Sequence, residues 1–349
     1  MPMRGYLSKT LSRFVTKSVK IMRASSAPTT YSSSPVWIAC LISTLFTILV
    51  TFSTGGRVAW AGFVLPMGVI AALAAIHCAI RLRNQTPELE CAPGVVAAIV
   101  WSGLMVLIAT FAGLRANNPL IDSALARSDS LLGFNAPWLI GVVSGHSFVL
   151  AMLSFLYHNT MPGLLATAII LSFGKLRQRS WDLAFSFVFC STVCGVISVI
   201  FPAEGTFAHY NIASDVIAGL PKGAGTYYMP VFESFRSGAS TTIDFDRLTG
   251  VVTFPSFHGA TALMTAFALR DVRWVAPVAW VWCILVHVST IPMGGHYGTD
   301  LVVGGLLWGV SVWVAALLTK QARPACARPQ GVHAFHGRIF NTFVGPDKF

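Results

Sequence analysis

The 349-residue chain is strongly apolar and basic, with 54% hydrophobic residues, 11% charged residues and a formal net charge of +11. A soluble domain carries about 25% charged residues, so this composition excludes a soluble globular protein and indicates that most of the chain lies in lipid. The basic residues stand in short segments between apolar runs, which membrane orientation explains without a nucleic-acid partner. The seven cysteines fall mostly inside apolar runs and predict no disulfide framework.

The first 35 residues carry six lysines and arginines and no acidic residue. This composition predicts a basic cytoplasmic arm, residues 1–35, that is drawn to anionic lipid. An organelle transit peptide has a similar basic, serine-rich composition and stays open as the alternative.

Eight apolar segments follow, and they predict an all-α integral membrane protein. A helix of about 20 residues crosses the ~30 Å hydrocarbon layer. The predicted spans are Val36–Thr54, Val58–Ile80, Val95–Leu114, Met161–Gly174, Trp181–Phe201, Phe254–Leu269, Trp274–Pro292 and His296–Leu318. We divide the chain into N-terminal transmembrane helices (36–94), a membrane core (95–319) with a long outer loop (202–253), and a cytoplasmic tail (320–349).

The region between the third and fourth predicted spans is less regular. Leu120–Phe134 mixes apolar residues with Asp122, Arg127 and Asp129, which predicts an amphipathic helix at the interface. Residues 136–174 fit either two short spans or one span preceded by an interfacial helix. One crossing there places most basic residues and both termini on the cytoplasmic side, whereas two crossings divide the basic residues about evenly. We therefore predict eight spans, with the long loop on the outer face.

The stretch from Gly250 to Gly304 contains the residues best suited to chemistry. His258 and His296 each stand where a polar loop meets an apolar helix, and Asp300 follows His296 by four residues. Positions i and i+4 share a helix face, so Asp300 can bond one ring nitrogen of His296 and leave the other free, as in an activated histidine. Burying such a pair in a membrane is expensive, which favours a functional role. Metal ligation is the weaker alternative, because no further ligand motif accompanies the pair.

These motifs resemble those of the type-2 phosphatidic acid phosphatase superfamily. Its proline-serine-glycine-histidine motif is similar to residues 255–258, with Phe257 in place of glycine. Its second motif is similar to Ser289, His296 and Asp300 at the right spacing, with Thr290 in place of arginine. The superfamily's upstream lysine and arginine-proline motif is absent. The phenylalanine and the His-Tyr-x-x-Asp ending look more like the inositol phosphorylceramide synthase branch and its bacterial relatives.

The residues predict phosphoryl transfer through a covalent intermediate. His296, oriented by Asp300, would attack the phosphorus atom of a lipid phosphate, and His258 would protonate the leaving oxygen. The resemblance implies the same three roles, a six-helix lipid-phosphatase-like core, and no metal or other cofactor. It also implies a phospholipid, sphingolipid or polyprenyl phosphate as substrate. With the predicted topology, it implies a bacterial inner membrane protein whose active site faces the periplasm.

The charge on a phosphate must be neutralised during transfer, yet the superfamily's basic ligands are missing from their motif positions. We predict that Arg236, Arg247 and Lys222 of the outer loop replace them, since arginine suits bidentate phosphate contacts. Ser256 and Thr290 are predicted to donate further hydrogen bonds to the substrate.

Three functions fit this sequence. The leading prediction is a lipid phosphatase, because water is the default acceptor of the phosphoryl group. The second is a lipid phosphotransferase that moves a phosphoinositol-like head group onto a ceramide or diacylglycerol hydroxyl. The third is a non-catalytic membrane transporter or scaffold, although the chain shows no internal repeat of the kind common in transporters. The motifs do not decide between water and a lipid alcohol.

Overall fold

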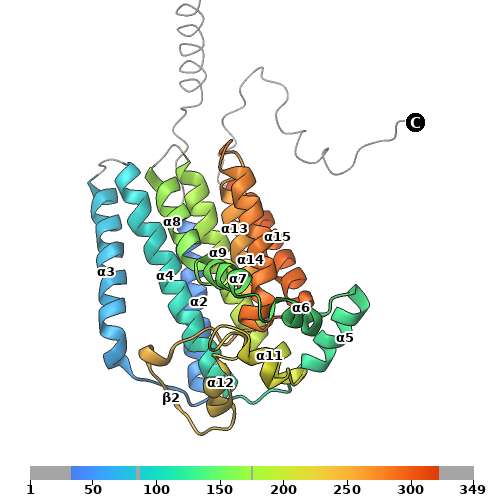
Figure 1. Cartoon of the computed structure of the whole chain (residues 1–349). Helices are drawn as coiled ribbons and strands as arrows, with labels where there is room; N and C mark the ends of the chain where they lie inside the picture. Colours follow the sequence, from blue (N-terminus) through green and yellow to red (C-terminus); the bar gives the residue numbers. More distant parts are fainter. Residues whose placement is uncertain (1–32, 84–86, 174–175, 322–349) are drawn as a thin grey trace, which may run out of the picture.

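The computed structural model describes residues 33–83, 87–173 and 176–321, so nearly all of the predicted basic arm and cytoplasmic tail lie outside the described residues. The predicted all-α membrane fold is confirmed: long helices run side by side in one bundle (Figure 1). The described residues contain two short strands, β1 (Arg57–Val58) and β2 (Thr242–Ile243), which pair in parallel beside the bundle.

Among the described residues, six helices are each long and apolar enough to cross a membrane. They are α2 (Ser34–Ser53), α3 (Trp60–Leu82), α4 (Pro87–Leu114), α9 (Arg177–Ile200), α14 (Ala276–Gly294) and α15 (Gly298–Gln321). The first of them begins, and the last of them ends, at the same end of the bundle (Figure 1). This arrangement agrees with a chain that crosses an even number of times.

The two remaining predicted spans form shorter helices. The segment predicted to cross at 161–174 is α8 (Thr160–Phe173), which follows α7 (Ser147–His158) at a bend of 49°, and the pair together is long enough to count as a seventh span. The segment predicted at 254–269 is α13 (Phe257–Ala268), whose 12 residues extend only about 18 Å. The described residues thus give six or seven spans by length where the sequence predicts eight, because α13 begins inside the bundle.

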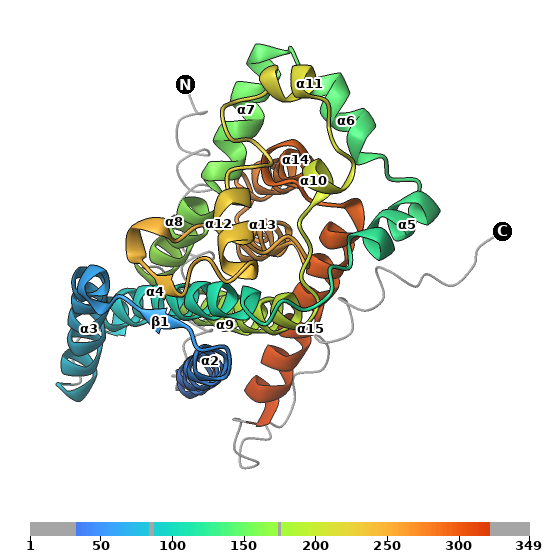
Figure 2. The same ribbon diagram turned by 90° about the horizontal axis from the view of Figure 1, so that it is seen from below.

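Helix α13 stands at the centre of the molecule. Seen from below, it is surrounded by the other helices (Figure 2), and it packs against α8, α9, α14 and α15. Helices α2 and α3 lie outside this group, where they pack on α4, and α2 also contacts α9. The residues at the start of α13 are therefore held by several neighbouring elements.

Short helices cover the lower end of the bundle in Figure 1. They are α5 (Asp122–Leu132), α6 (Ala136–Val143), α10 (Thr206–His209), α11 (Ser214–Ala218), α12 (Met229–Arg236) and the 3₁₀ helix η1 (Phe245–Arg247). The last four belong to the long loop predicted at 202–253, which is therefore a folded cover. Its backbone is bonded to the turn between α14 and α15, since Thr206 N–H donates to the Gly295 carbonyl and Gly225 N–H to the Met293 carbonyl.

Helix α5 forms where the sequence predicts an interfacial amphipathic helix, and it ends at Gly133, whose φ of 77° suits a glycine after a helix. Its orientation differs from a simple amphipathic pattern. Asp122 and Asp129 are buried, whereas Leu131 and Leu132 are 83% and 57% exposed. The two carboxylates face the bundle because they accept hydrogen bonds there, as described below.

Candidate active site

His296 lies in the turn between α14 and α15, and its ring is held by Asp300. Helix α14 ends at Gly294, and Gly295 takes a left-handed conformation (φ 70°) that lets the chain turn into α15. His296 Nδ1 lies 3.2 Å from Asp300 Oδ2, and the two side chains are 2% and 0% exposed. Because a carboxylate only accepts hydrogen bonds, Nδ1 carries the proton and Nε2 keeps its lone pair. This is the pairing that the i, i+4 spacing predicts.

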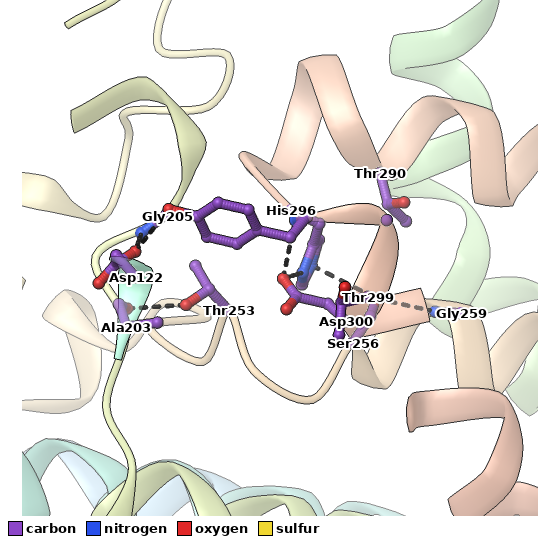
Figure 3. A network of polar contacts seen from close by, with 12 residues as sticks. Asp122, Ala203, Gly205, Thr253, Ser256, Gly259, Thr290, His296, Thr299 and Asp300 are labelled. Carbon is purple, nitrogen blue, oxygen red and sulfur yellow. Dashed lines mark hydrogen bonds and ion pairs between the residues drawn. The ribbon is translucent and has the colours of Figure 1, made fainter. Parts of the chain in front are cut away.

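Ser256 joins this pair to the start of α13. Its side chain caps the helix by accepting from Gly259 N–H at 3.3 Å, and the same hydroxyl lies 3.5 Å from His296 Nε2 (Figure 3). Its backbone N–H donates to the Asp300 carbonyl at 3.0 Å. A Cβ on Gly304 would collide with the Ser256 carbonyl oxygen, so glycine at that position permits α15 to approach the start of α13.

His258 is the second residue of α13 and lies beside His296. The centroids of the two rings are 6.5 Å apart. The His258 ring stacks on Tyr157 of α7, with centroids 4.3 Å apart and planes inclined by 16°. The Tyr157 hydroxyl in turn lies 3.2 Å from the Tyr227 hydroxyl of the cover. The structure therefore brings both predicted histidines together, and it adds Tyr157 as a support for His258 that sequence reasoning missed.

Helix α5 supports the His296 turn through its two aspartates. Asp129 accepts from the backbone N–H groups of Gly298 (2.9 Å) and Thr299 (2.7 Å), and from the Thr299 hydroxyl (2.6 Å), at the start of α15. Asp122 accepts from the Tyr297 hydroxyl at 2.9 Å and from two backbone N–H groups of residues 204–205. Sequence reasoning placed these aspartates at the interface and missed this role. Their separation of seven residues, which places both on one helix face, was the available signal.

The predicted phosphate ligands are only partly assembled. Thr290 is buried and donates its hydroxyl proton to the His287 carbonyl at 2.7 Å, apart from the His296 cluster (Figure 3). Arg247 is exposed, lies 3.9 Å from Asp244, and belongs to η1, which packs on α3. Lys222 is exposed on the cover. Ser256 is therefore the one predicted ligand that the structure brings against the histidine pair among the residues described.

Arg236 occupies an intermediate position at the end of α12. Its Nη1 donates to the Asn118 carbonyl at 3.0 Å, and its guanidinium lies over the Phe232 ring. Partial burial lowers the pKa of Arg236, while the carboxylates of Glu204 and Asp122 act in the opposite direction. Because Asp122 also binds Tyr297, Arg236 stands on the side of the cover that supports the His296 turn.

Comparison with known proteins identifies the superfamily of this chain. The sequence profile of the PAP2 superfamily matches residues 123–314, more than half of the chain. The chain belongs to the PAP2 superfamily. Neither the curated proteins nor the solved structures yield a match. The match covers both histidines and Asp300, and it begins within α5, so the helix that supports the turn is part of the PAP2 region.

Superfamily membership defines the general class of this PAP2 protein. PAP2 proteins are generally phosphatases or phosphotransferases. The six apolar helices make the protein a multi-pass integral membrane protein. Within that class, the buried histidine with a free Nε2 and the second histidine beside it are suited to nucleophilic and acid–base chemistry respectively.

Proposed function

We propose that this protein is a membrane-embedded lipid phosphatase that works through a phosphohistidine intermediate without a metal. The observation that carries the proposal is the buried hydrogen bond between His296 Nδ1 and Asp300 Oδ2, which leaves His296 Nε2 as the nucleophile. The substrate class is an amphiphilic phosphate ester, such as a phospholipid, a sphingolipid phosphate or a polyprenyl phosphate.

In the first step, His296 Nε2 attacks the phosphorus atom. A bond forms between nitrogen and phosphorus, and the bond from phosphorus to the lipid oxygen breaks. The leaving oxygen takes a proton from His258, which starts the step as an imidazolium and ends it neutral. The phosphorylated His296 ring is cationic, so the buried Asp300 carboxylate stabilises the intermediate as well as orienting the ring.

In the second step, neutral His258 accepts a proton from water as the water oxygen attacks phosphorus. The bond between phosphorus and His296 Nε2 breaks, and inorganic phosphate leaves. Both histidines return to their starting protonation states, so one ester and one water give one alcohol and one phosphate. The stack of His258 on Tyr157 supports this assignment, because it fixes the ring that must act in both steps.

The N-terminus of α13 neutralises part of the negative charge of the phosphoryl group. A helix N-terminus carries roughly half a positive charge and N–H groups that bind anions. Ser256 caps α13 while its hydroxyl lies 3.5 Å from His296 Nε2, so a phosphoryl group on Nε2 stands close to that helix end. We propose Arg236 as a further source of positive charge and assign no direct role to Arg247 and Lys222.

A second function, lipid phosphotransfer, is favoured by the scarcity of cations beside the histidine pair in the part of the chain that the structure describes. A phosphodiester carries less negative charge than a monoester, and Thr290 stands where the superfamily has an arginine. The resemblance to the inositol phosphorylceramide synthase branch points the same way. In that reaction a lipid alcohol such as ceramide or diacylglycerol replaces water in the second step, with His258 again accepting the proton.

The two functions are separated by measuring both products at once. Purified protein in detergent, with EDTA present, is given lipid phosphate monoesters and phosphodiesters with and without a lipid alcohol. A phosphatase releases inorganic phosphate without an acceptor, and His296→Ala abolishes that release. A new phospholipid without free phosphate would identify a transferase. Turnover that survives in His296→Ala, or that requires an added metal, would overturn the proposed mechanism.

We also propose that the protein lies in a bacterial inner membrane with the histidine pair toward the periplasm. The charge bias of the sequence supports this orientation. Helix α2 begins and α15 ends at the end of the bundle opposite the cover (Figure 1), so the cover and the two termini would face opposite sides of the membrane. A single cysteine introduced at Ser123, which is exposed on α5, tests it. Labelling in intact cells by a membrane-impermeant thiol reagent is expected, and labelling only after lysis would reverse the orientation.

A further inference from the structure

A large cavity beside His258 plays no part in the mechanism above. It has a volume of about 940 Å³, near the upper end of the range for ligand pockets, which is about 300–1,000 Å³. Helices α4, α8 and α9 form its walls, and residues 245–252 of the cover close one side. Those three helices pack against one another (Figure 1), and the cavity between them is partly open and reaches Pro66 of α3.

The lining of the cavity is mostly apolar, and its polar residues include Asp246 and Thr249 of the cover. Tyr227, His158 and His258 also line the cavity. Along α4, Ile99, Gly103 and Leu107 line one face at intervals of four residues. Two hydroxyls of the wall already have partners: Thr110 donates to the Leu107 carbonyl, and Ser191 lies 3.1 Å from the Val188 carbonyl and 2.9 Å from the Ser102 hydroxyl of α4.

The length of the cavity also matches a lipid. Its lining on α4 runs from Ile99 to Thr110, which at 1.5 Å per residue is roughly 17 Å. Half of the ~30 Å hydrocarbon layer is about 15 Å. A hydrocarbon chain in the cavity would therefore have about the length that it has in one leaflet.

We propose that this cavity binds the hydrocarbon chain of the alcohol half of the substrate, the half whose oxygen exchanges a proton with His258. This inference rests on the proposed function for the role of His258. The cavity meets the site at His258 and not at His296, so it lies on the side of the leaving group. The phosphoryl group then lies toward His296, and the chain length of the alcohol becomes the property that the protein selects.

Gly103 offers a direct way to fill the cavity. A Cβ at this position would meet only the Phe187 ring, at 3.9 Å, so alanine fits and a larger side chain extends into the cavity. Gly68 of α3 is a matched control, because it is also inside a helix, is exposed, and would meet nothing within 4 Å. Leucine is favoured over glycine in a helix at both positions.

The first arm of the test measures binding without turnover. A hexadecanol that carries a photoreactive diazirine is irradiated with the detergent-purified protein, and the labelled peptides are identified. Label is expected on the part of α4 around Gly103 in the wild type and in Gly68→Leu, and is expected to be lost in Gly103→Leu. Label confined to other helices, or unchanged in Gly103→Leu, would overturn the cavity assignment whether or not the protein is an enzyme.

The second arm compares hydrolysis of hexadecyl phosphate and butyl phosphate at equal mole fractions in detergent. Gly103→Leu is expected to lower kcat/KM for the long ester about tenfold, the effect of roughly two methylenes that no longer find room, and to leave the short ester within about twofold. Gly103→Ala gives a smaller change in the same direction. Equal losses on both esters would contradict the inference. Normal labelling without hydrolysis of either ester would instead remove the phosphatase function and keep the cavity.

Discussion

At the scale of single residues, the site depends on one buried carboxylate. Asp300 Oδ2 accepts from both His296 Nδ1 and Tyr297 N–H, at 3.2 Å and 2.9 Å, while Oδ1 has no hydrogen-bond partner among the described residues. An ionised group in a membrane protein interior is costly unless it is paired. This carboxylate is paired most strongly when His296 is cationic, which would be its state in the proposed phosphohistidine intermediate.

The substitution Asp300→Asn tests whether Asp300 acts by orienting the His296 ring or through its negative charge. The amide oxygen can take the place of Oδ2 and keep both hydrogen bonds, while the amide nitrogen takes the place of the unpaired Oδ1. We therefore expect a nearly unchanged melting temperature and a fall in kcat on the order of 10²–10⁴-fold, as for loss of an acid–base partner. Steady-state kinetics and thermal unfolding check this, with Asp215→Asn, an exposed aspartate on α11, as control. Activity within about twofold of wild type would show that the charge has no role.

The two predicted hydroxyl ligands are expected to behave differently. Ser256→Ala removes a helix cap, at a cost of about 1 kcal/mol, and removes the hydroxyl beside His296 Nε2. A loss of kcat/KM of about tenfold is expected, since a hydrogen bond to a charged group contributes about 1.5–3 kcal/mol. Thr290→Val removes a hydroxyl that bonds within its own helix, and is expected to keep activity within about twofold. Equal losses in the two variants would place Thr290 at the substrate.

At the scale of elements, α5 links the cover to the catalytic turn. Asp129 holds the start of α15 through Gly298 and Thr299, and Asp122 holds Tyr297, so one short helix binds the three residues that follow His296. Negative charge at a helix N-terminus is also favourable by itself. Helix α5 therefore positions His296 through the three residues that follow it in the chain, and its carboxylates do not contact the imidazole ring.

Asp129→Asn tests this support. One side-chain oxygen can still accept from Thr299, but an amide NH₂ group would face Gly298 N–H, so two donors would oppose each other. We expect a stability loss of about 1–3 kcal/mol and a lower kcat with little change in KM. Thermal unfolding and kinetics measure both quantities, and Ser130→Ala, an exposed change on the same helix, is the control. A variant that is destabilised yet has wild-type kcat would make α5 a purely structural element.

Some features of the elements can be predicted from the sequence, and others cannot. The long helices follow from runs of apolar residues, and the His296–Asp300 pair follows from i, i+4 spacing, because both are local properties. The inward face of α5 is set by backbone N–H groups that lie about 170 residues away, at the start of α15. Likewise, α13 is short because the cover returns the chain into the bundle. The seven-residue spacing of Asp122 and Asp129 places them on one helix face but does not name their distant partners, so the interfacial helix was predicted without its role.

At the scale of the whole molecule, one group of helices holds the histidine pair and another lines the cavity. The starts of α13 and α15 and the end of α14 hold the histidine pair, and α4, α8 and α9 line the mostly apolar cavity that includes His258. The cover closes over both. The sequence predicts the cluster of motifs and the membrane class, whereas the cavity appears only when the helices are assembled. Arg247 and Lys222, which we predicted to compensate for the missing arginine at position 290, are exposed on the cover, and Arg247 lies 3.9 Å from Asp244.

The central claim is that the phosphoryl group passes through His296, and the most direct test is to trap it there. The variant His258→Ala is mixed with p-nitrophenyl phosphate, whose leaving group needs no proton, so the first step proceeds while water activation is lost. After quenching in alkali, which preserves phosphohistidine, peptide mass spectrometry locates the added phosphoryl group. We predict one phosphoryl group on the peptide that contains His296, with none in the double variant that also carries His296→Ala. A phosphoryl group on any other residue, or none on the protein while nitrophenol is released, would contradict this account.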